Sequence, residues 1–420
     1  MRQAVTTLRP LLLGGLLAIP ALPALADAPD ANVLYNHHCA ICHGISRLGG
    51  IGPALLPDNL SRLKADEAVS VIRDGRPATQ MPAYRELLSE EEVAALAEWI
   101  FEPPEQEPSW EEADILASHE VPHPYGSLPD APVFEVEDLK NLFIVVEIGD
   151  HHVSLLDGDR FERIARFPSR YALHGGPKYS PDGRYVYFGS RDGWVTKYDI
   201  YNLEVTAEVR AGINMRNIAV SADGHYVLAG NYLPHSLVLL DARDLDLIAV
   251  IPVEGLDGNT SRVSAVYTAP PRNSFVAALR DIPEVWEIRW PEERAEGDEA
   301  IVGDFALHRV EAPDYLDDFF FDQEYRYIVG AARGGQGGQV FDLDEERKVA
   351  DLPLEGMPHL GAGITWERDG TRVMAMPHID KGQVSVFDMS DWSLITHIET
   401  DGPGFFMRSH ENSPYAWVDV

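Results

Sequence analysis

A repeat of about 42 residues runs through most of this chain and limits the folds that the chain can adopt. The run from Ser180 holds an Asp-Gly turn followed by an apolar stretch, and a similar run begins at Ser221. A looser copy begins at Arg368. A second pattern, an apolar stretch that ends in aspartate, recurs at Asp157, Asp199, Asp241, Asp342 and Asp388, of which the first three are evenly spaced.

This period predicts a β-propeller over residues 141–420. Each Asp-Gly pair makes a tight turn into a strand, and several strands per repeat of this length are typical of propeller blades. A β-sandwich is the structural alternative. We count roughly six repeats between residues 141 and 400, and another begins at Tyr415. Because a propeller must close to pair its edge strands, we expect the sequence to lack the last one or two blades, roughly.

Both cysteines of the chain lie in one motif, Cys39 and Cys42 followed by His43. C-x-x-C-H is the attachment site of a c-type haem, in which the two thiols bind the porphyrin and the histidine binds the iron. The cysteines are thereby used, so we expect no disulfide. The motif predicts one covalent haem c.

The residues after this motif read as a small all-α class I cytochrome c domain, residues 27–102. Helices are expected near 31–38, 65–73 and 90–100, the last capped by Ser89. Met81, before a proline and about 40 residues after the haem motif, is the expected sixth iron ligand. The alternatives are a buried loop methionine at this position, and His37 or His38 as the ligand.

Residues 1–26 have the pattern of an export signal. Arg2 and Arg9 precede a short apolar stretch, and Ala24 and Ala26 form a small-residue cleavage site. The apolar stretch is shorter than the ~20 residues that span a bilayer, although an uncleaved anchor is the alternative. We therefore expect a periplasmic protein that does not span the membrane.

The chain is strongly acidic, with 34 basic and 68 acidic side chains and a net charge of −34. This charge argues against nucleic acid as a partner, because phosphates need basic side chains. Residues 103–140 are rich in proline and are expected to form a linker, or an arm lying over the second domain. The acidic surplus either steers basic redox partners or reflects solubility.

A cytochrome c domain ahead of a propeller resembles the cytochrome cd1 family. The segments that carry the resemblance are 171–178, 190–199, 211–216, 229–235 and 357–361. The resemblance implies an eight-bladed propeller that binds haem d1, or its dihydro precursor, non-covalently. It implies His174 as the d1 iron ligand, and Arg191, Lys197 and Arg216 as basic side chains near the acidic substituents of d1. Buried carboxylates need such charged donors.

One site departs from the nitrite reductases of this family, which use two distal histidines. His359 matches one of them, but Asp317 stands where the other is expected. This favours the branch of cytochrome-fused dihydro-haem d1 dehydrogenases, which convert a propionate of the precursor to an acrylate. Electrons would leave through the c haem. The alternatives are a nitrite reductase that makes nitric oxide and a non-catalytic d1 carrier or electron-transfer protein.

The catalytic base is left open among three histidines. We expect His359, His410 or His378 to serve. For His359 the alternative is a ligand on the opposite side of the d1 iron, and for the last two it is a hydrogen-bonded structural histidine. The expected partners are the dihydro-haem d1 substrate, a periplasmic electron acceptor, and nitrite reductase or other d1-assembly proteins.

Overall fold

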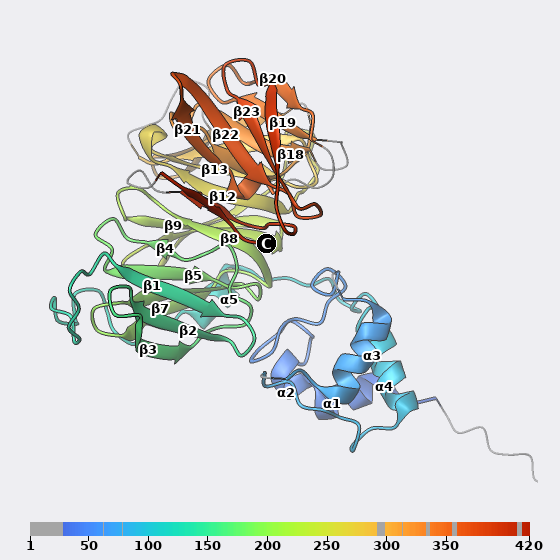
Figure 1. Ribbon diagram of the computed structural model, residues 1–420. Helices are drawn as coiled ribbons and strands as arrows, with labels where there is room; N and C mark the ends of the chain where they lie inside the picture. The colour runs from blue at the N-terminus through green and yellow to red at the C-terminus, as the bar shows by residue number, and fades with distance from the viewer. Residues whose placement is uncertain are drawn as a thin grey trace, which may run out of the picture.

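The computed structural model describes residues 28–61, 63–77, 79–291, 299–312, 314–332, 337–354, 359–409 and 414–420. The export signal predicted over residues 1–26 lies outside these ranges. No helix in the described part of the chain is long and apolar enough to cross a membrane. Figure 1 shows a small helical domain beside a much larger domain of β-sheets, whose sheets follow one another in chain order from green to red.

The helical domain matches the expected cytochrome c pattern. Asp30 caps the first helix through the amides of Asn32 and Val33, and Ser89 caps the last one in a reciprocal pair with Glu92. The apolar stripe of the last helix is buried as predicted. The helices are α1 (Ala31–His38), α2 (Ala40–His43), α3 (Ala65–Asp74) and α4 (Glu90–Trp99).

The proline-rich segment lies along the propeller. Its one helix, α5 (Glu112–Ser118), packs against β7 (Glu204–Arg210) through buried Ile115. Farther along, Glu120 pairs with Glu208 as an isolated bridge, and the amide of Val133 donates to the carbonyl of Tyr201. The segment is therefore an arm that is tied to the sheets by its backbone.

Consecutive antiparallel strands build the sheets, which is the propeller pattern and excludes the β-sandwich. The first sheet has β1 (Leu142–Glu147), β2 (His152–Asp157) and β3 (Glu162–Pro168). The second has β4 (Lys178–Tyr179), β5 (Tyr185–Gly189), β6 (Trp194–Asp199) and β7. The third has β8 (Asn214–Val220), β9 (Tyr226–Leu233), β10 (Ser236–Asp241) and β11 (Leu247–Pro252).

The fourth sheet departs from the four-strand pattern, because β15 adds a fifth strand at its edge in the order β12-β13-β14-β16-β15. Its strands are β12 (Val263–Ala269), β13 (Ser274–Leu279), β14 (Glu284–Arg289), β15 (Glu299–Val302) and β16 (Phe305–Glu311), with the short helix η1 (Pro270–Arg272) between the first two.

Two further four-stranded sheets and a hairpin complete the described chain. The fifth sheet has β17 (Leu316–Phe321), β18 (Tyr327–Ala332), β19 (Gly338–Asp342) and β20 (Arg347–Leu352). After the helix η2 (Leu360–Ala362), the sixth has β21 (Ile364–Arg368), β22 (Thr371–Pro377), β23 (Gln383–Asp388) and β24 (Leu394–Glu399). The hairpin pairs β25 (Met407–Ser409) with β26 (Ala416–Val418). The six sheets agree with the repeats counted in the sequence.

In the second sheet the two sequence patterns are joined by an ion pair. Arg184 follows an Asp-Gly turn, and its Nη2 lies 2.9 Å from Oδ2 of Asp199, the aspartate that ends β6. In the fifth sheet Arg326 and Asp342 repeat this pair at 2.6 Å. In these two sheets the pair fastens the turn before the second strand to the end of the third strand.

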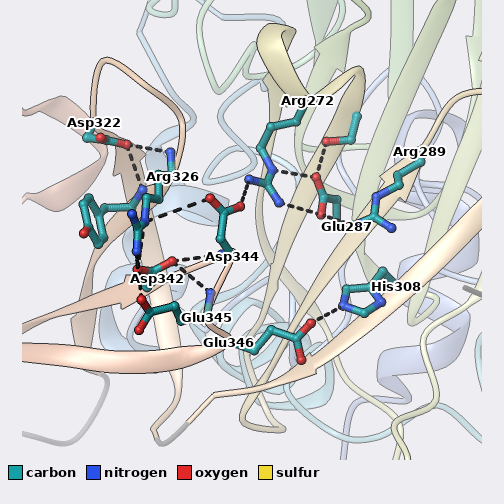
Figure 2. A network of polar contacts seen from close by, with 12 residues as sticks. Arg272, Glu287, Arg289, His308, Asp322, Arg326, Asp342, Asp344, Glu345 and Glu346 are labelled. Atoms are coloured by element: carbon teal, nitrogen blue, oxygen red, sulfur yellow. Dashed lines mark hydrogen bonds and ion pairs between the residues drawn. The ribbon is translucent and has the colours of Figure 1, made fainter. Parts of the chain in front are cut away.

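Figure 2 shows how ion pairs also join neighbouring sheets. Arg272, in η1, donates to Glu287 of its own sheet at 2.8 Å. The same guanidinium donates at 2.6 Å to Asp344, which follows β19 in the next sheet. One largely buried arginine thus spans the boundary between two sheets.

Candidate functional site

The haem motif has the geometry that a c haem needs. His43 is buried, and its Nδ1 lies 2.8 Å from the carbonyl oxygen of Pro53. If Nδ1 donates this hydrogen bond, Nε2 keeps its lone pair for a metal. A Cβ at Gly52 would lie 2.8 Å from the imidazole, so only glycine lets this loop pack on the ring. Cys39 and Cys42 are free thiols at the start and in the middle of the short α2 turn. These residues fit a covalent haem.

Met81 lies in a loop that the end of α3 holds in place. Its carbonyl oxygen accepts from the amide of Arg76 at 3.1 Å, and its own amide donates to the hydroxyl of Thr79 at 3.2 Å. A Cβ at Gly75 would meet the Met81 carbonyl at 2.7 Å, so the loop needs a glycine there. The role of Met81 as sixth ligand stays a prediction.

The first strands of four sheets build the second site. Strands β4, β8, β12 and β17 each open a sheet, and neighbours in this series contact one another. Residues that are far apart in the sequence are therefore brought together at one place, where the first strands of four sheets meet.

His174 lies at the centre of this site, in the loop before β4. Its Nδ1 is 2.8 Å from the carbonyl oxygen of Arg216, a residue of β8. Its Nε2 lies 2.9 Å from Nη2 of Arg191 and 3.1 Å from Nη1 of Arg216. Because guanidinium groups only donate, Nε2 is the acceptor and carries the lone pair that a metal would take. Three of the predicted d1-site residues therefore meet.

Beyond Arg216 the site continues into an acidic residue. Nη2 of Arg216 lies 3.0 Å from Oδ2 of Asp318 on β17, and both side chains are largely buried. The hydroxyl of Tyr267, on β12, donates to the other oxygen of Asp318 at 2.9 Å. Burial and this carboxylate raise the pKa of Tyr267 well above its usual value, so the phenol stays protonated.

Lys178 adds a further basic group, and its Nζ donates to the carbonyl of Gly175 at 2.7 Å. Burial lowers the pKa of Lys178, and the positive charge of nearby Arg408 lowers it further. The negative charge of Asp318 raises the pKa of the same lysine. Lys178, Arg408 and Asp318 are thus near one another, although the sequence marked none of them as a site residue.

The structure does not bring Lys197 to this cluster. The side chain is 1% exposed, its Nζ donates to the carbonyl of Arg243 at 2.6 Å, and it lies 3.9 Å from the ring centre of Tyr185. Burial lowers its pKa to about 8. We therefore assign Lys197 to the packing between the second and third sheets rather than to d1 binding.

Asp317 and its neighbour Asp318 point to different partners. Oδ1 of Asp317 lies 3.2 Å from Nη1 of Arg280, which also donates to the hydroxyl of Tyr232 at 2.9 Å. The guanidinium carbon of Arg191 lies 5.8 Å from the centre of the same tyrosine ring. Tyr232 thus connects the Asp317 pair to the cluster around His174.

His359 caps η2, which contacts β17. Its Nδ1 contacts the carbonyl oxygen of Phe405, and its ring centre is 5.6 Å from that of Phe406. Two residues later, a Cβ at Gly361 would lie 2.5 Å from Oδ2 of Asp318. The turn that carries His359 therefore packs directly against the acidic end of the cluster.

His378 is placed differently from His359. It is 0% exposed, and its Nε2 lies 2.8 Å from the hydroxyl of Ser385 inside the sixth sheet. Ser385 in turn contacts His397 at 3.0 Å. These contacts favour a structural part for His378. His410 lies outside the described residues, as do positions 357 and 358 of the segment that carries the family resemblance.

Comparison with known proteins matches both domains. Residues 137–420 match the family model described as "Cytochrome D1 heme domain", and residues 26–100 match "Cytochrome C oxidase, cbb3-type, subunit III". The chain is 57% identical over 401 residues to a dihydro-haem d1 dehydrogenase of Pseudomonas aeruginosa, covering 95% of the chain and 79% of that protein.

Two other relatives bear on the choice of function. A nitrite reductase of Stutzerimonas stutzeri is 24% identical, covering 97% of the chain and 78% of that protein. Among solved structures, the dihydro-haem d1 dehydrogenase NirN in complex with DHE matches with a TM-score of 0.87 and 57% identity. That match covers 93% of the chain and 81% of the solved chain.

Proposed function

The chain belongs to the cytochrome D1 haem-domain family that includes the dihydro-haem d1 dehydrogenases, and from this premise we propose that it oxidises a propionate of dihydro-haem d1 to an acrylate. The observation that carries this proposal is the cluster of Arg191 and Arg216 around His174. It is a basic site suited to an acidic tetrapyrrole. The same chain carries the attachment motif of a c haem, and the iron of that haem can accept electrons.

The reaction removes two hydrogen atoms from neighbouring carbons. The side chain changes from CH2–CH2–COO⁻ to CH=CH–COO⁻, and two electrons and two protons leave. The covalent haem supplies one-electron acceptance when it is bound, with His43 and Met81 as the proposed iron ligands. The c haem accepts one electron at a time, whereas the reaction releases two. An external acceptor must therefore re-oxidise the c haem before the second electron is transferred.

The residues around His174 would bind and orient the substrate. His174 Nε2 is the proposed ligand of the substrate iron, while Arg191 and Arg216 would pair with its carboxylates. Arg216 is already paired with Asp318, so its guanidinium is held in one orientation before a substrate carboxylate arrives. Holding one end of a substrate in this way fixes the reacting side chain against a proton acceptor.

For the proton acceptor we propose His359, with His410 as the second candidate. The turn of His359 packs against Asp318, and an imidazole can take a proton near neutral pH. His378 is buried in the sixth sheet and is the weakest of the three for this role.

Nitrite reduction is disfavoured by the pair of Arg280 and Asp317. A nitrite reductase needs a proton-donating, anion-friendly group where Asp317 stands. The ion pair at 3.2 Å stabilises the deprotonated carboxylate, which neither donates a proton nor attracts an anion.

We propose that the protein works in the periplasm and passes its electrons to a periplasmic acceptor. The leader pattern of residues 1–26 and the c-haem motif support this location. The product would then be available to nitrite reductase or to other d1-assembly proteins.

The test is anaerobic incubation of the c-haem-loaded protein with dihydro-haem d1 and excess acceptor. We expect the spectrum of the d1 product to appear while the added acceptor is reduced, and the c haem itself to become reduced when the acceptor is left out. His174→Ala should lose tetrapyrrole binding with an unaltered c-haem spectrum. Steady nitric oxide formation from nitrite, with no conversion of the dihydro compound, would assign the reductase function instead.

A further inference from the structure

One arginine of the propeller reaches both haem-binding parts of the chain. Arg210 ends β7 and is 5% exposed. Its Nη2 donates to the carbonyl of Leu48, in the helical domain, at 2.5 Å. Its Nε donates to the carbonyl of Asp192, in the turn before β6, at 2.8 Å. A single guanidinium thus joins two loops that belong to different domains and lie far apart in the sequence.

Each of these loops leads directly to a haem-site histidine. On the helical side, the amide of Gly49, next to Leu48, donates to the carbonyl of His43 at 2.9 Å. On the propeller side, Asp192 directly follows Arg191, whose guanidinium lies 2.9 Å from His174. Through its two hydrogen bonds, Arg210 therefore connects the loop next to the proposed c-haem ligand, His43, to the loop next to the proposed d1 ligand, His174.

The arm fixes the orientation of Arg210. The guanidinium carbon lies 4.5 Å from the ring centre of Trp110, and the indole Nε1 of Trp110 donates to the Arg210 carbonyl at 2.9 Å. The amide of Arg210 donates to the hydroxyl of Ser118 in α5 at 2.9 Å. A stacked and doubly bonded guanidinium has little freedom to leave this position.

The surface around Arg210 is apolar and joins the same two domains. Ala54 and Leu56 of the helical domain are buried in one cluster with Ile213 of the propeller. Near the Met81 loop, Arg76 is close enough to the propeller for its charge to act on His151 and Tyr171, although burial sets both directions, lowering the pKa of His151 and raising that of Tyr171. The loops on both sides of the c-haem site therefore face the propeller near His174.

We propose that Arg210 is a positioning residue for electron transfer, which holds the c-haem loop against the loop that carries Arg191. The rate of electron transfer falls steeply with the distance between two redox centres, so a fixed domain arrangement determines it. The part of this inference that concerns electron flow rests on the proposed dehydrogenase function. The part that concerns domain docking does not.

The experiment compares the full-length, c-haem-loaded protein with Arg210→Ala and Arg210→Lys. Arg163→Ala is the matched control, because Arg163 is exposed on β3. Hydrogen exchange of residues 44–56 and 190–193 reports the docking, and the rate of c-haem reduction after mixing with dihydro-haem d1 reports the electron transfer. The dissociation constant of the tetrapyrrole and the c-haem spectrum are measured on every variant.

We expect Arg210→Ala to speed hydrogen exchange in both loops roughly tenfold, because a hydrogen bond from a charged group to each loop is lost. The rate of c-haem reduction should fall, while tetrapyrrole affinity and the c-haem spectrum stay as in the wild type. Arg210→Lys should restore part of the rate, since it keeps the charge but cannot reach both carbonyls. Arg163→Ala should match the wild type.

Unchanged exchange and an unchanged reduction rate in Arg210→Ala would overturn the proposal. If that variant fails to accumulate, Arg210→Lys and Trp110→Ala decide the question by the same two measurements. If the wild type itself does not reduce its c haem with dihydro-haem d1, the dehydrogenase function fails, and the exchange data still test the docking.

Discussion

Arg216 holds Asp318 at 3.0 Å while its other amino group lies 3.1 Å from Nε2 of His174. The basic centre of the propeller is therefore already paired on one side with a carboxylate. A tetrapyrrole carboxylate that binds here meets a guanidinium whose orientation is set by Asp318 and whose charge is partly compensated. We therefore expect Asp318 to orient Arg216 and to limit the affinity of the proposed site for carboxylates.

Arg216 and Asp318 should have opposite effects on binding. We expect Arg216→Ala to weaken the binding of dihydro-haem d1 by roughly 10- to 100-fold, because a charge-assisted hydrogen bond of ~1.5–3 kcal/mol is lost. Asp318→Asn should bind as tightly as the wild type or more tightly. Titration followed by the tetrapyrrole absorption measures both constants. Equal weakening by the two variants would contradict this assignment.

Met81→Ala tests the c-haem site on its own. A thioether ligand favours reduced iron, so its loss should lower the c-haem potential and remove the sulfur-to-iron charge-transfer band. A redox titration of the variant measures the potential, and binding of dihydro-haem d1 serves as the control, which should not change. A variant with the wild-type band and potential would exclude Met81 as a ligand.

The buried pair of Arg184 and Asp199 should be sensitive to the loss of one partner. Asp199 is 0% exposed and also accepts from Asn202 at 2.9 Å. Removal of Arg184 alone leaves a buried carboxylate, so Arg184→Met should cost about 3–5 kcal/mol of unfolding free energy. The double variant Arg184→Met with Asp199→Leu should recover much of this loss. Urea unfolding followed by circular dichroism measures it, and a double variant no more stable than Arg184→Met would contradict it.

Local patterns predicted much of the fold, because they report interactions between near neighbours. Ser89 caps α4 through a residue one turn away, and the Asp-Gly turns and strand-ending aspartates mark the sheets. The fifth strand, β15, had no such signal. Its pairing with β16 adds to the edge of a sheet without altering the repeated pattern.

The site was predicted less completely than the fold. The structure brings together His174, Arg191 and Arg216, which the family resemblance named, but the resemblance did not name Tyr267 or Lys178 as site residues. Contacts between the first strands of different sheets depend on how the sheets pack, and no spacing in the sequence reports them. Lys197, which the resemblance also named, lies apart from these residues. It follows Arg191 closely in the sequence, but extended chain spans up to ~20 Å over that length, which carries it away from the loop.

Asp192 makes stability depend on pH in a direction opposite to that of most acidic residues. Burial raises its pKa to about 6, although Arg210, Arg170 and the hydroxyl of Ser190 favour the charged form. Because the folded pKa exceeds the usual value of 3.8, the stability that this group contributes is full below pH about 3.8. That contribution is lost as the pH rises through about 6.

Asp192→Asn removes this titration. As the pH rises from about 5 to 7.5, the unfolding free energy of the wild type should fall relative to that of the variant by roughly 1.4 kcal/mol. Chemical denaturation at several pH values measures the difference. Parallel curves for the two proteins across this range would show that Asp192 does not titrate there.

We expect Asp317 to disfavour nitrite reduction. Its ion pair with Arg280 stabilises the carboxylate, so the wild type should form little nitric oxide from nitrite while it converts dihydro-haem d1. Asp317→His would restore an imidazole that can donate a proton, and we expect this variant to form more nitric oxide than the wild type when loaded with d1. Asp317→Asn is the matched control, because it removes the negative charge without adding a proton donor. An amperometric nitric oxide electrode and the c-haem absorbance follow both reactions in the same sample. Equal nitric oxide formation by the histidine and asparagine variants would show that charge alone, and not proton donation at this position, keeps nitrite from reacting.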